Sequence, residues 1–234
     1  MAADGLNAYR PDELATVNGA ALLFDPSGAM WWPEERMLVV ADLHFEKGSS
    51  FAARRGVLLP PYDTRETLAR LEALCGLYAP QAVIALGDSF HDLEAAGRLG
   101  EDEVERIRAL TSARDWYWIE GNHDPKPPGD LGGSCVATLA CGPLLFRHLP
   151  QPGAQPGEVA GHLHPAARVT VRGRGLRRRC FVTDGSRLIL PSFGAYTGGL
   201  DVRDRAFAGL LGPSFHAWMI GQDRVYPVAS RRLG

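Results

Sequence analysis

Short apolar runs divide the first half of the chain, and a polar block follows three of them directly. The runs cover residues 37–41, 82–86 and 116–119 and show little alternation between apolar and polar positions. Such runs are typical of strands that are buried on both faces of a sheet. An earlier segment, residues 20–32, predicts two further strands on either side of a turn at Asp25-Pro26-Ser27-Gly28.

The segment between the first two runs predicts a loop followed by a helix. Residues 48–62 are rich in small residues and prolines, which favours a loop. Leu68 and Leu71 then begin an apolar face with helical spacing. Asp63 is expected to be the N-cap of this helix, with Glu66 three residues later completing a capping pattern.

A second helix is predicted over residues 101–113, so the first half alternates strands and helices as a parallel α/β sheet does. The second half is rich in strand patterns, with a tight hairpin turn at residues 184–186. This combination predicts two packed sheets with helices outside. We treat residues 1–234 as one domain, with a motif core at 37–165 and a β-rich half at 135–228.

Composition adds few constraints. The 234 residues carry 25 basic and 27 acidic side chains, so the net charge of -2 gives no global signal for nucleic-acid binding, although a local patch can suffice. The four cysteines show no zinc-site spacing and are expected to be buried free thiols in a reducing compartment. The first residues lack the pattern of a secretory signal peptide, and no apolar stretch is long enough for a membrane span. We therefore expect a cytoplasmic protein.

Five polar blocks carry the candidate chemistry. Each closes or follows an apolar run, so the blocks are expected to lie on loops at one edge of a sheet, where strand ends meet. Their side chains are carboxylates, imidazoles and one carboxamide. The blocks are Asp42-Leu43-His44, Gly87-Asp88, Gly121-Asn122-His123-Asp124, His148 and Gly161-His162-Leu163-His164.

This donor set suits two divalent metal ions. Carboxylate, imidazole and amide oxygen ligands fit manganese, iron or zinc, and no cysteine is present that would favour zinc alone. Asp88 is the candidate bridge, because ions roughly 4 Å apart need shared negative charge. Alternation in an extended segment would point Asp42 and His44 the same way, and likewise His162 and His164. The glycine that precedes three of the blocks would allow sharp turns and close backbone approach.

In this order, the motifs D-x-H, G-D, G-N-H-D, H and G-H-x-H resemble those of the calcineurin-like metallophosphoesterase superfamily. The resemblance implies a four-layer αββα sandwich of two mixed sheets flanked by helices. It implies one metal held by Asp42, His44, Asp88 and His164, and a second held by Asp88, Asn122, His148 and His162. It also implies that His123 is catalytic and that Asp124 is its partner. The sequence departs from the family pattern at His91, where an acidic residue is usual; Asp92 follows it.

Two histidines have alternative interpretations. His148 stands in a block without a signature of its own, so a structural role is the alternative to ligation. His91 lies three residues after Asp88 and is a candidate contact for the leaving side of a diester, with a surface or supporting role as the alternative. The expected mechanism is attack on phosphorus by a hydroxide shared between the metals. His123 would protonate the leaving group, and Asp124 would hold its ring.

Flanking segments narrow the substrate class. ADLHFEKGSSFAARRG, ALGDSFHD, GHLHPAARV and LPSFGAYTGGLDV, among others, resemble the bacterial ligase-associated DNA damage response metallophosphoesterases. That resemblance runs from about residue 18 to residue 228. It implies a manganese-dependent phosphodiesterase with DNA endonuclease activity. It also implies an association with an ATP-dependent DNA ligase, a helicase and an exonuclease.

Basic residues compatible with a DNA substrate follow the first metal block and lie on a predicted hairpin. They are Lys47, Arg54 and Arg55 in the former place and Arg177 and Arg179 in the latter, and solvated surfaces are the alternative in both. Tyr196, in the glycine-rich segment 194–199, is a candidate for stacking on a base, with simple packing as the favoured alternative. Other functions left open are a phosphomonoesterase or a small cyclic-nucleotide phosphodiesterase, and a catalytically inactive scaffold. The intact Asn122, His123 and Asp124 argue against the scaffold.

Overall fold

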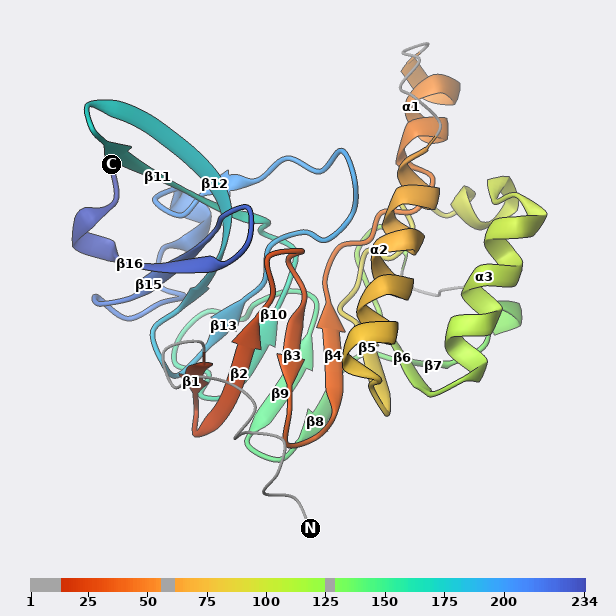
Figure 1. Ribbon diagram of the computed structural model, residues 1–234, viewed down its shortest axis with the longest axis horizontal. Helices are drawn as coiled ribbons and strands as arrows, with labels where there is room; N and C mark the ends of the chain where they lie inside the picture. Colours follow the sequence, from red (N-terminus) through yellow and green to blue (C-terminus); the bar gives the residue numbers. More distant parts are fainter. Residues whose placement is uncertain (1–13, 56–61, 125–128) are drawn as a thin grey trace.

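Two β-sheets face each other at the centre of the molecule (Figure 1). The computed structural model describes residues 14–55, 62–124 and 129–234. In these residues, the first sheet has the order β1-β2-β3-β4-β5-β6-β7, antiparallel from β1 to β4 and parallel from β4 to β7. Its strands are β1 (Leu14–Val17), β2 (Ala20–Phe24), β3 (Met30–Trp32), β4 (Met37–Val40), β5 (Ala82–Ala85), β6 (Asp115–Ile119) and β7 (Ser134–Val136).

The second sheet is built from the C-terminal half. Its order is β14-β11-β12-β13-β10-β9-β8, while β15 pairs with β12 and β16 pairs with β15. Strand β10 is parallel to both of its neighbours, β9 and β13. The strands are β8 (Leu139–Cys141), β9 (Leu144–Arg147), β10 (Glu158–Ala160), β11 (Pro165–Val171), β12 (Arg174–Thr183), β13 (Leu188–Ile189), β14 (Leu200–Asp201), β15 (His216–Ile220) and β16 (Val225–Ala229).

The apolar runs are buried on both faces, as their lack of alternation predicts. Val39 and Ile84 point into the core between the two sheets, where they join Phe146 of the second sheet. Leu38 and Val83, one residue earlier on each strand, point the other way into the core beneath the helices. Since successive side chains on a strand alternate faces, a strand between two apolar layers must be apolar at every position.

Two α-helices, α2 (Asp63–Tyr78) and α3 (Glu101–Ser112), cover the outer face of the first sheet (Figure 1). The predicted fold, two mixed sheets flanked by helices, is therefore confirmed. In the described residues, the outer face of the second sheet is covered by short 3-10 turns instead of α-helices. These are η5 (Arg205–Phe207) and η6 (Ser230–Arg232); η3 (Ala95–Arg98) and η4 (Gly129–Leu131) belong to the helical side.

The loop predicted over residues 48–62 is wrong in its first half, because Lys47–Arg55 forms helix α1. Residues 56–61 lie outside the described part of the chain. The predicted N-cap is also wrong, since Tyr62 occupies that position and makes no side-chain cap. The buried Asp63 carboxylate instead accepts a hydrogen bond of 2.9 Å from the backbone N–H of Gly48, at the start of α1. A tertiary contact thus satisfies a free donor of the neighbouring helix, which local pattern could not reveal.

All five polar blocks follow parallel strands. The first three come after β4, β5 and β6 of the first sheet, and the last two come after β9 and β10 of the second. The ends of these strands meet at one edge of the two-sheet core, which brings the blocks together. No helix among the described residues is long and apolar enough to cross a membrane.

Candidate metal centre

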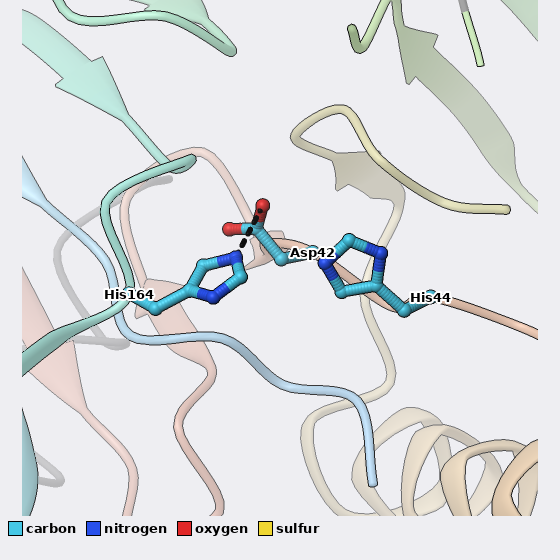
Figure 2. Close-up of side chains that lie close together, drawn as sticks. All are labelled: Asp42, His44 and His164. Atoms are coloured by element: carbon cyan, nitrogen blue, oxygen red, sulfur yellow. Dashed lines mark ion pairs between the residues drawn. The ribbon is translucent and has the colours of Figure 1, made fainter. Parts of the chain in front are cut away.

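The first cluster of ligand atoms contains Asp42, His44 and His164, as Figure 2 shows. Each offers one ligand atom, and the three atoms lie within 4.8 Å of one another. The Nε2 atom of His164 is 2.9 Å from Oδ1 of Asp42, but the pair lacks the geometry of a hydrogen bond. Both atoms, together with Nδ1 of His44, are buried without a hydrogen-bond partner. Buried polar atoms that converge without pairing are what a metal site requires.

The second cluster contains Asp88, His148 and His162, again with ligand atoms within 4.8 Å of one another. Nδ1 of His148 donates to the carbonyl of Leu86 at 3.0 Å, which leaves Nε2 facing the cluster. Around that single nitrogen lie Oδ1 of Asn122 at 2.9 Å, Nδ1 of His162 at 3.2 Å and Oδ2 of Asp88 at 3.3 Å. Asn122 thus joins the second cluster, as the family resemblance implies.

Each aspartate uses one carboxylate oxygen to bind backbone and directs the other into the centre. Oδ2 of Asp42 accepts from the N–H of His162 at 3.0 Å, and Oδ1 of Asp88 accepts from the N–H of His123 at 2.9 Å. These bonds orient the carboxylates, and fixed orientation is what a metal-ligating carboxylate needs. The two clusters adjoin, since Oδ1 of Asp42 lies 4.0 Å from Nδ1 of His148.

The electrostatics of the centre favour added positive charge. Burial lowers the pKa of His44 to about 3, so this ring is neutral and can act as a ligand. Burial also lowers the pKa of His162, helped by the charge on His148. Burial opposes the charged form of His148, but Asp88 and Asp42 outweigh it and raise its pKa to about 9. Burial would raise the pKa of Asp88, yet the interaction with His148 holds it below its usual range.

The donor set fits two divalent ions. It offers carboxylate, imidazole and amide oxygen, with no thiolate among the described ligand groups, which suits manganese, iron or zinc. The buried, unpartnered atoms of Asp42, His44 and His164 support this fit independently of any family pattern.

The backbone that presents these ligands is not extended, so the geometric reason predicted for the D-x-H and H-x-H spacing is wrong. Asp42 and His44 have φ values of 54° and 46°, and His162 and His164 have 67° and 46°. In both motifs, the two ligands separated by one residue therefore have a left-handed backbone conformation. Such conformations are strained for non-glycine residues and gather at functional sites. The expected outcome still holds, because Asp42 and His44 reach the same cluster.

Glycines allow the blocks to pack tightly, as predicted. Gly87 has a φ of 75°, and a Cβ atom there would overlap the ring of His148. A Cβ at Gly121 would overlap the backbone nitrogen of Asp88 and the carboxylates of both Asp88 and Asp124. At Gly161 it would come within 2.8 Å of Oδ2 of Asp42. Any side chain at Gly121 would therefore displace the candidate bridging ligand.

His123 lies at the open side of the centre, with Nε2 3.9 Å from Oδ2 of Asp88. Its Nδ1 donates to the backbone carbonyl of His91 at 3.0 Å. The prediction that Asp124 holds this ring is therefore wrong. The buried Asp124 carboxylate accepts from the backbone N–H groups of Ser89 and Phe90, at 2.9 and 3.1 Å. Through these two bonds Asp124 holds the loop that carries Asp88 and the His91 carbonyl.

A cavity of about 590 Å³ opens beside His123, and we call it the imidazole pocket. His91 lines it, stacked on the ring of His123 at 5.5 Å and edge-on to His44 at 5.4 Å. His91 thus faces the centre, as its position three residues after Asp88 suggested. Lys47 also lines the pocket, and burial lowers the pKa of its ammonium group. Asp92 also lines the pocket, and its carboxylate accepts hydrogen bonds from Ser50 and Arg98.

The remaining basic candidates are spread out. The side chains of Arg54 and Arg55 lie outside the described residues, although both belong to α1. Arg177 is exposed and donates to the carbonyl of Gly199, whereas the partly buried Arg179 donates to the carbonyl of Ser192. Within the described residues, neither arginine forms a hydrogen bond or an ion pair with a member of either cluster.

Three features of the centre carry no motif in the sequence. The Leu86 carbonyl that orients His148 is a backbone group and leaves no signal. Ser192, which is fully buried, donates to the carbonyl of Asp42 at 3.1 Å. Gly194 donates to the same carbonyl at 3.1 Å, and a Cβ there would overlap the backbone of Leu43. Only the glycine-rich character of 194–199 hints that this segment approaches another part of the backbone.

Comparison with known proteins agrees with this geometry. Residues 35–185 match the calcineurin-like phosphoesterase family, and the chain belongs to this family of metal-dependent hydrolases. The crystal structure of the nuclease MPE of Pseudomonas putida superposes with a TM-score of 0.69 at 29% identity, covering 92% of this chain and 98% of that one. Yfce, a phosphoesterase from E. coli, gives a TM-score of 0.42 at 14% identity over 82% of this chain and 97% of its own, too low to support an argument. No curated protein matches the chain.

Proposed function

We propose that this protein is a binuclear-metal phosphodiesterase that cleaves DNA internally. The observation that carries the proposal is the pair of adjoining ligand clusters, in the first of which the buried ligand atoms of Asp42, His44 and His164 have no hydrogen-bond partner. The similarity to a nuclease over nearly the full length of both chains supports nucleic acid as the substrate. Lys47, which lines the imidazole pocket, is compatible with a polyanionic substrate.

Each proposed ligand is assigned to one of the two ions. Asp42, His44 and His164 would hold one ion, and Asn122, His148 and His162 would hold the other, with Asp88 shared. Two divalent ions, when bound, would supply an acidified water as the nucleophile and neutralise charge on the phosphate. We propose manganese as the native metal, with iron or zinc as alternatives.

His123 is the proposed general acid. Its Nδ1 is occupied by the His91 carbonyl, so Nε2 is the atom that faces the centre and can deliver a proton to the leaving oxygen. The side chain is half exposed, so leaving group and solvent can both reach it. His91 lines the same pocket, and we propose that it contacts the leaving side of a diester.

We further propose that the protein acts in DNA repair in the cytoplasm, together with an ATP-dependent DNA ligase, a helicase and an exonuclease. This rests on the flanking segments that resemble the ligase-associated group. Deletion of the gene should sensitise its host to DNA damage; normal survival under several damaging agents would argue against the role.

The decisive experiment incubates metal-stripped protein with circular single-stranded DNA and adds one divalent metal at a time. Nicking is expected with manganese. His123→Ala should abolish it, whereas His216→Ala, an exposed histidine on β15, should not. These variants exclude a contaminating nuclease. Absence of nicking with every metal, alongside robust hydrolysis of a phosphate monoester, would favour the phosphomonoesterase function instead.

A further inference from the structure

A second cavity, of about 240 Å³, lies beside residues 194–197. Arg70 of α2 and Arg179 of β12 both line it, and Tyr196 lies at its edge with 43% of its surface exposed. We call this cavity the arginine pocket. The sequence alone gives no reason to select Arg70, because Glu66 and Arg70 have the i, i+4 spacing of an ordinary ion pair on the surface of a helix.

The arginine pocket adjoins the first metal cluster through the segment 194–199. At one end, the N–H of Gly194 donates to the carbonyl of Asp42 at 3.1 Å. At the other end, the N–H of Leu200 donates to the carbonyl of His164 at 3.1 Å. Figure 2 shows this light-blue segment passing beside both ligands. The pocket is therefore tied to the backbone of two proposed metal ligands.

Both guanidinium groups are held in place before any ligand binds. Arg70 lies over the ring of Phe193, with 5.1 Å between the guanidinium carbon and the ring centroid. Its Nε atom is buried without a hydrogen-bond partner. Arg179 is anchored by its bond to the Ser192 carbonyl. A guanidinium that is already oriented loses less entropy when it binds a phosphate through its planar fork.

The charge of the pocket is unbalanced. The only carboxylate among its described lining residues is Glu66, which is 58% exposed and lies 3.7 Å from Arg70. A pair this exposed is weak. Burial lowers the pKa of both arginines, and the charge on Arg70 lowers that of Arg179 further. Two partly buried cations beside one solvated anion would gain from a bound anion.

We propose that the arginine pocket binds a second, non-scissile phosphate of the same nucleic-acid strand, with Tyr196 placed to stack on the adjoining base. The proposal rests on the function proposed above and specifies how a polymeric substrate is distinguished from a small ester. Arg70 and Arg179 would then determine specificity without contacting the reacting phosphate.

The test compares Arg70→Gln, Arg179→Gln and the double variant with wild type on two substrates. One is a single-stranded oligonucleotide, and the other is bis(p-nitrophenyl) phosphate, a diester without neighbouring phosphates. Arg108→Gln, an exposed arginine on α3, is the matched control. In the double variant we expect kcat/KM on the oligonucleotide to fall about tenfold, with the small diester within about twofold. The slope of log KM against log salt should decrease by about 0.7 for one lost phosphate contact to a single strand.

Two outcomes would overturn the proposal. An unchanged kcat/KM and salt slope on the oligonucleotide would show that the pocket binds no phosphate. Equal losses on both substrates with a lower Tm would assign the arginines a structural role. Failure of the wild type to cleave any oligonucleotide, with the small diester still hydrolysed, would instead contradict the proposed DNA substrate and remove the basis of this inference.

Discussion

The imidazole pocket and the arginine pocket are lined by different residues and differ in chemistry. His91 and His123 line the first, and an imidazole can both donate and accept a proton. Arg70 and Arg179 line the second, and guanidinium groups keep their charge at any physiological pH. Proton transfer needs a group that titrates, whereas steady attraction of phosphate needs one that does not. The contrast suggests a division between reaction and recognition.

The two pockets also differ in how the chain builds them. The imidazole pocket combines His91 and His123, which follow strands β5 and β6, with Lys47 of helix α1. The arginine pocket combines Arg70 from the middle of helix α2, Arg179 from strand β12 and the glycine-rich segment 194–199. Loss of a group in the first should therefore affect every substrate, and loss of a group in the second should affect polymers alone.

The largest effect should come from Asp88→Asn. This change removes the negative charge that we propose the two metals share while keeping the shape of the side chain, so both metals should bind poorly. We expect activity on the oligonucleotide and on bis(p-nitrophenyl) phosphate to fall by about 10³-fold, equivalent to about 4 kcal/mol. Metal content by mass spectrometry should fall in parallel. Asp130→Asn, an exposed carboxylate, is the control. Full metal occupancy with full activity would refute the bridging role.

His123→Ala should lower kcat on both diesters by about 10²-fold, the lower end of the range for a lost general acid. Metal content should stay near that of the wild type, because His123 is not among the ligand clusters. Steady-state kinetics on both substrates, with His216→Ala alongside, checks the prediction. A loss of activity confined to the oligonucleotide would contradict the assignment of the reaction to the imidazole pocket and of substrate recognition to the arginine pocket.

Asp124→Ala should reduce both stability and activity. It leaves the buried N–H groups of Ser89 and Phe90 without an acceptor, at a cost of about 1–3 kcal/mol each. The displaced loop would misplace the His91 carbonyl, so kcat should fall by about 10- to 100-fold. Thermal unfolding and kinetics measured together test this. An unchanged Tm with a shifted pH profile of kcat would instead support a direct interaction between Asp124 and His123.

The smallest effect should come from His91→Ala. We expect a severalfold loss of kcat/KM on bis(p-nitrophenyl) phosphate and a smaller loss on p-nitrophenyl phosphate, because we propose that the His91 ring, which lines the imidazole pocket, contacts the leaving side of a diester. The backbone carbonyl that holds His123 is kept in this variant. Equal losses on the two substrates would contradict the proposed contact between His91 and the leaving side of the diester.

Much of the fold was predictable because apolar runs report burial directly. Strands β4, β5 and β6 and helices α2 and α3 lie where their patterns place them. Helix α1 was missed, since its small residues gain their helical conformation from contacts such as Gly48 with Asp63 and Ser50 with Asp92. Contacts between segments distant in sequence override weak local preference, and a local pattern cannot contain them.

The sequence by itself determined the chemistry of this protein. Carboxylates, histidines and glycines stand at the ends of apolar runs, and parallel strands must bring such ends to one edge. Only the tertiary structure decided how these groups are oriented. It gave left-handed conformations to alternate ligands, assigned Asp124 to the backbone instead of His123, and placed Arg70 beside Arg179. Orientation and long-range pairing depend on packing between distant segments, which no local pattern of residues encodes.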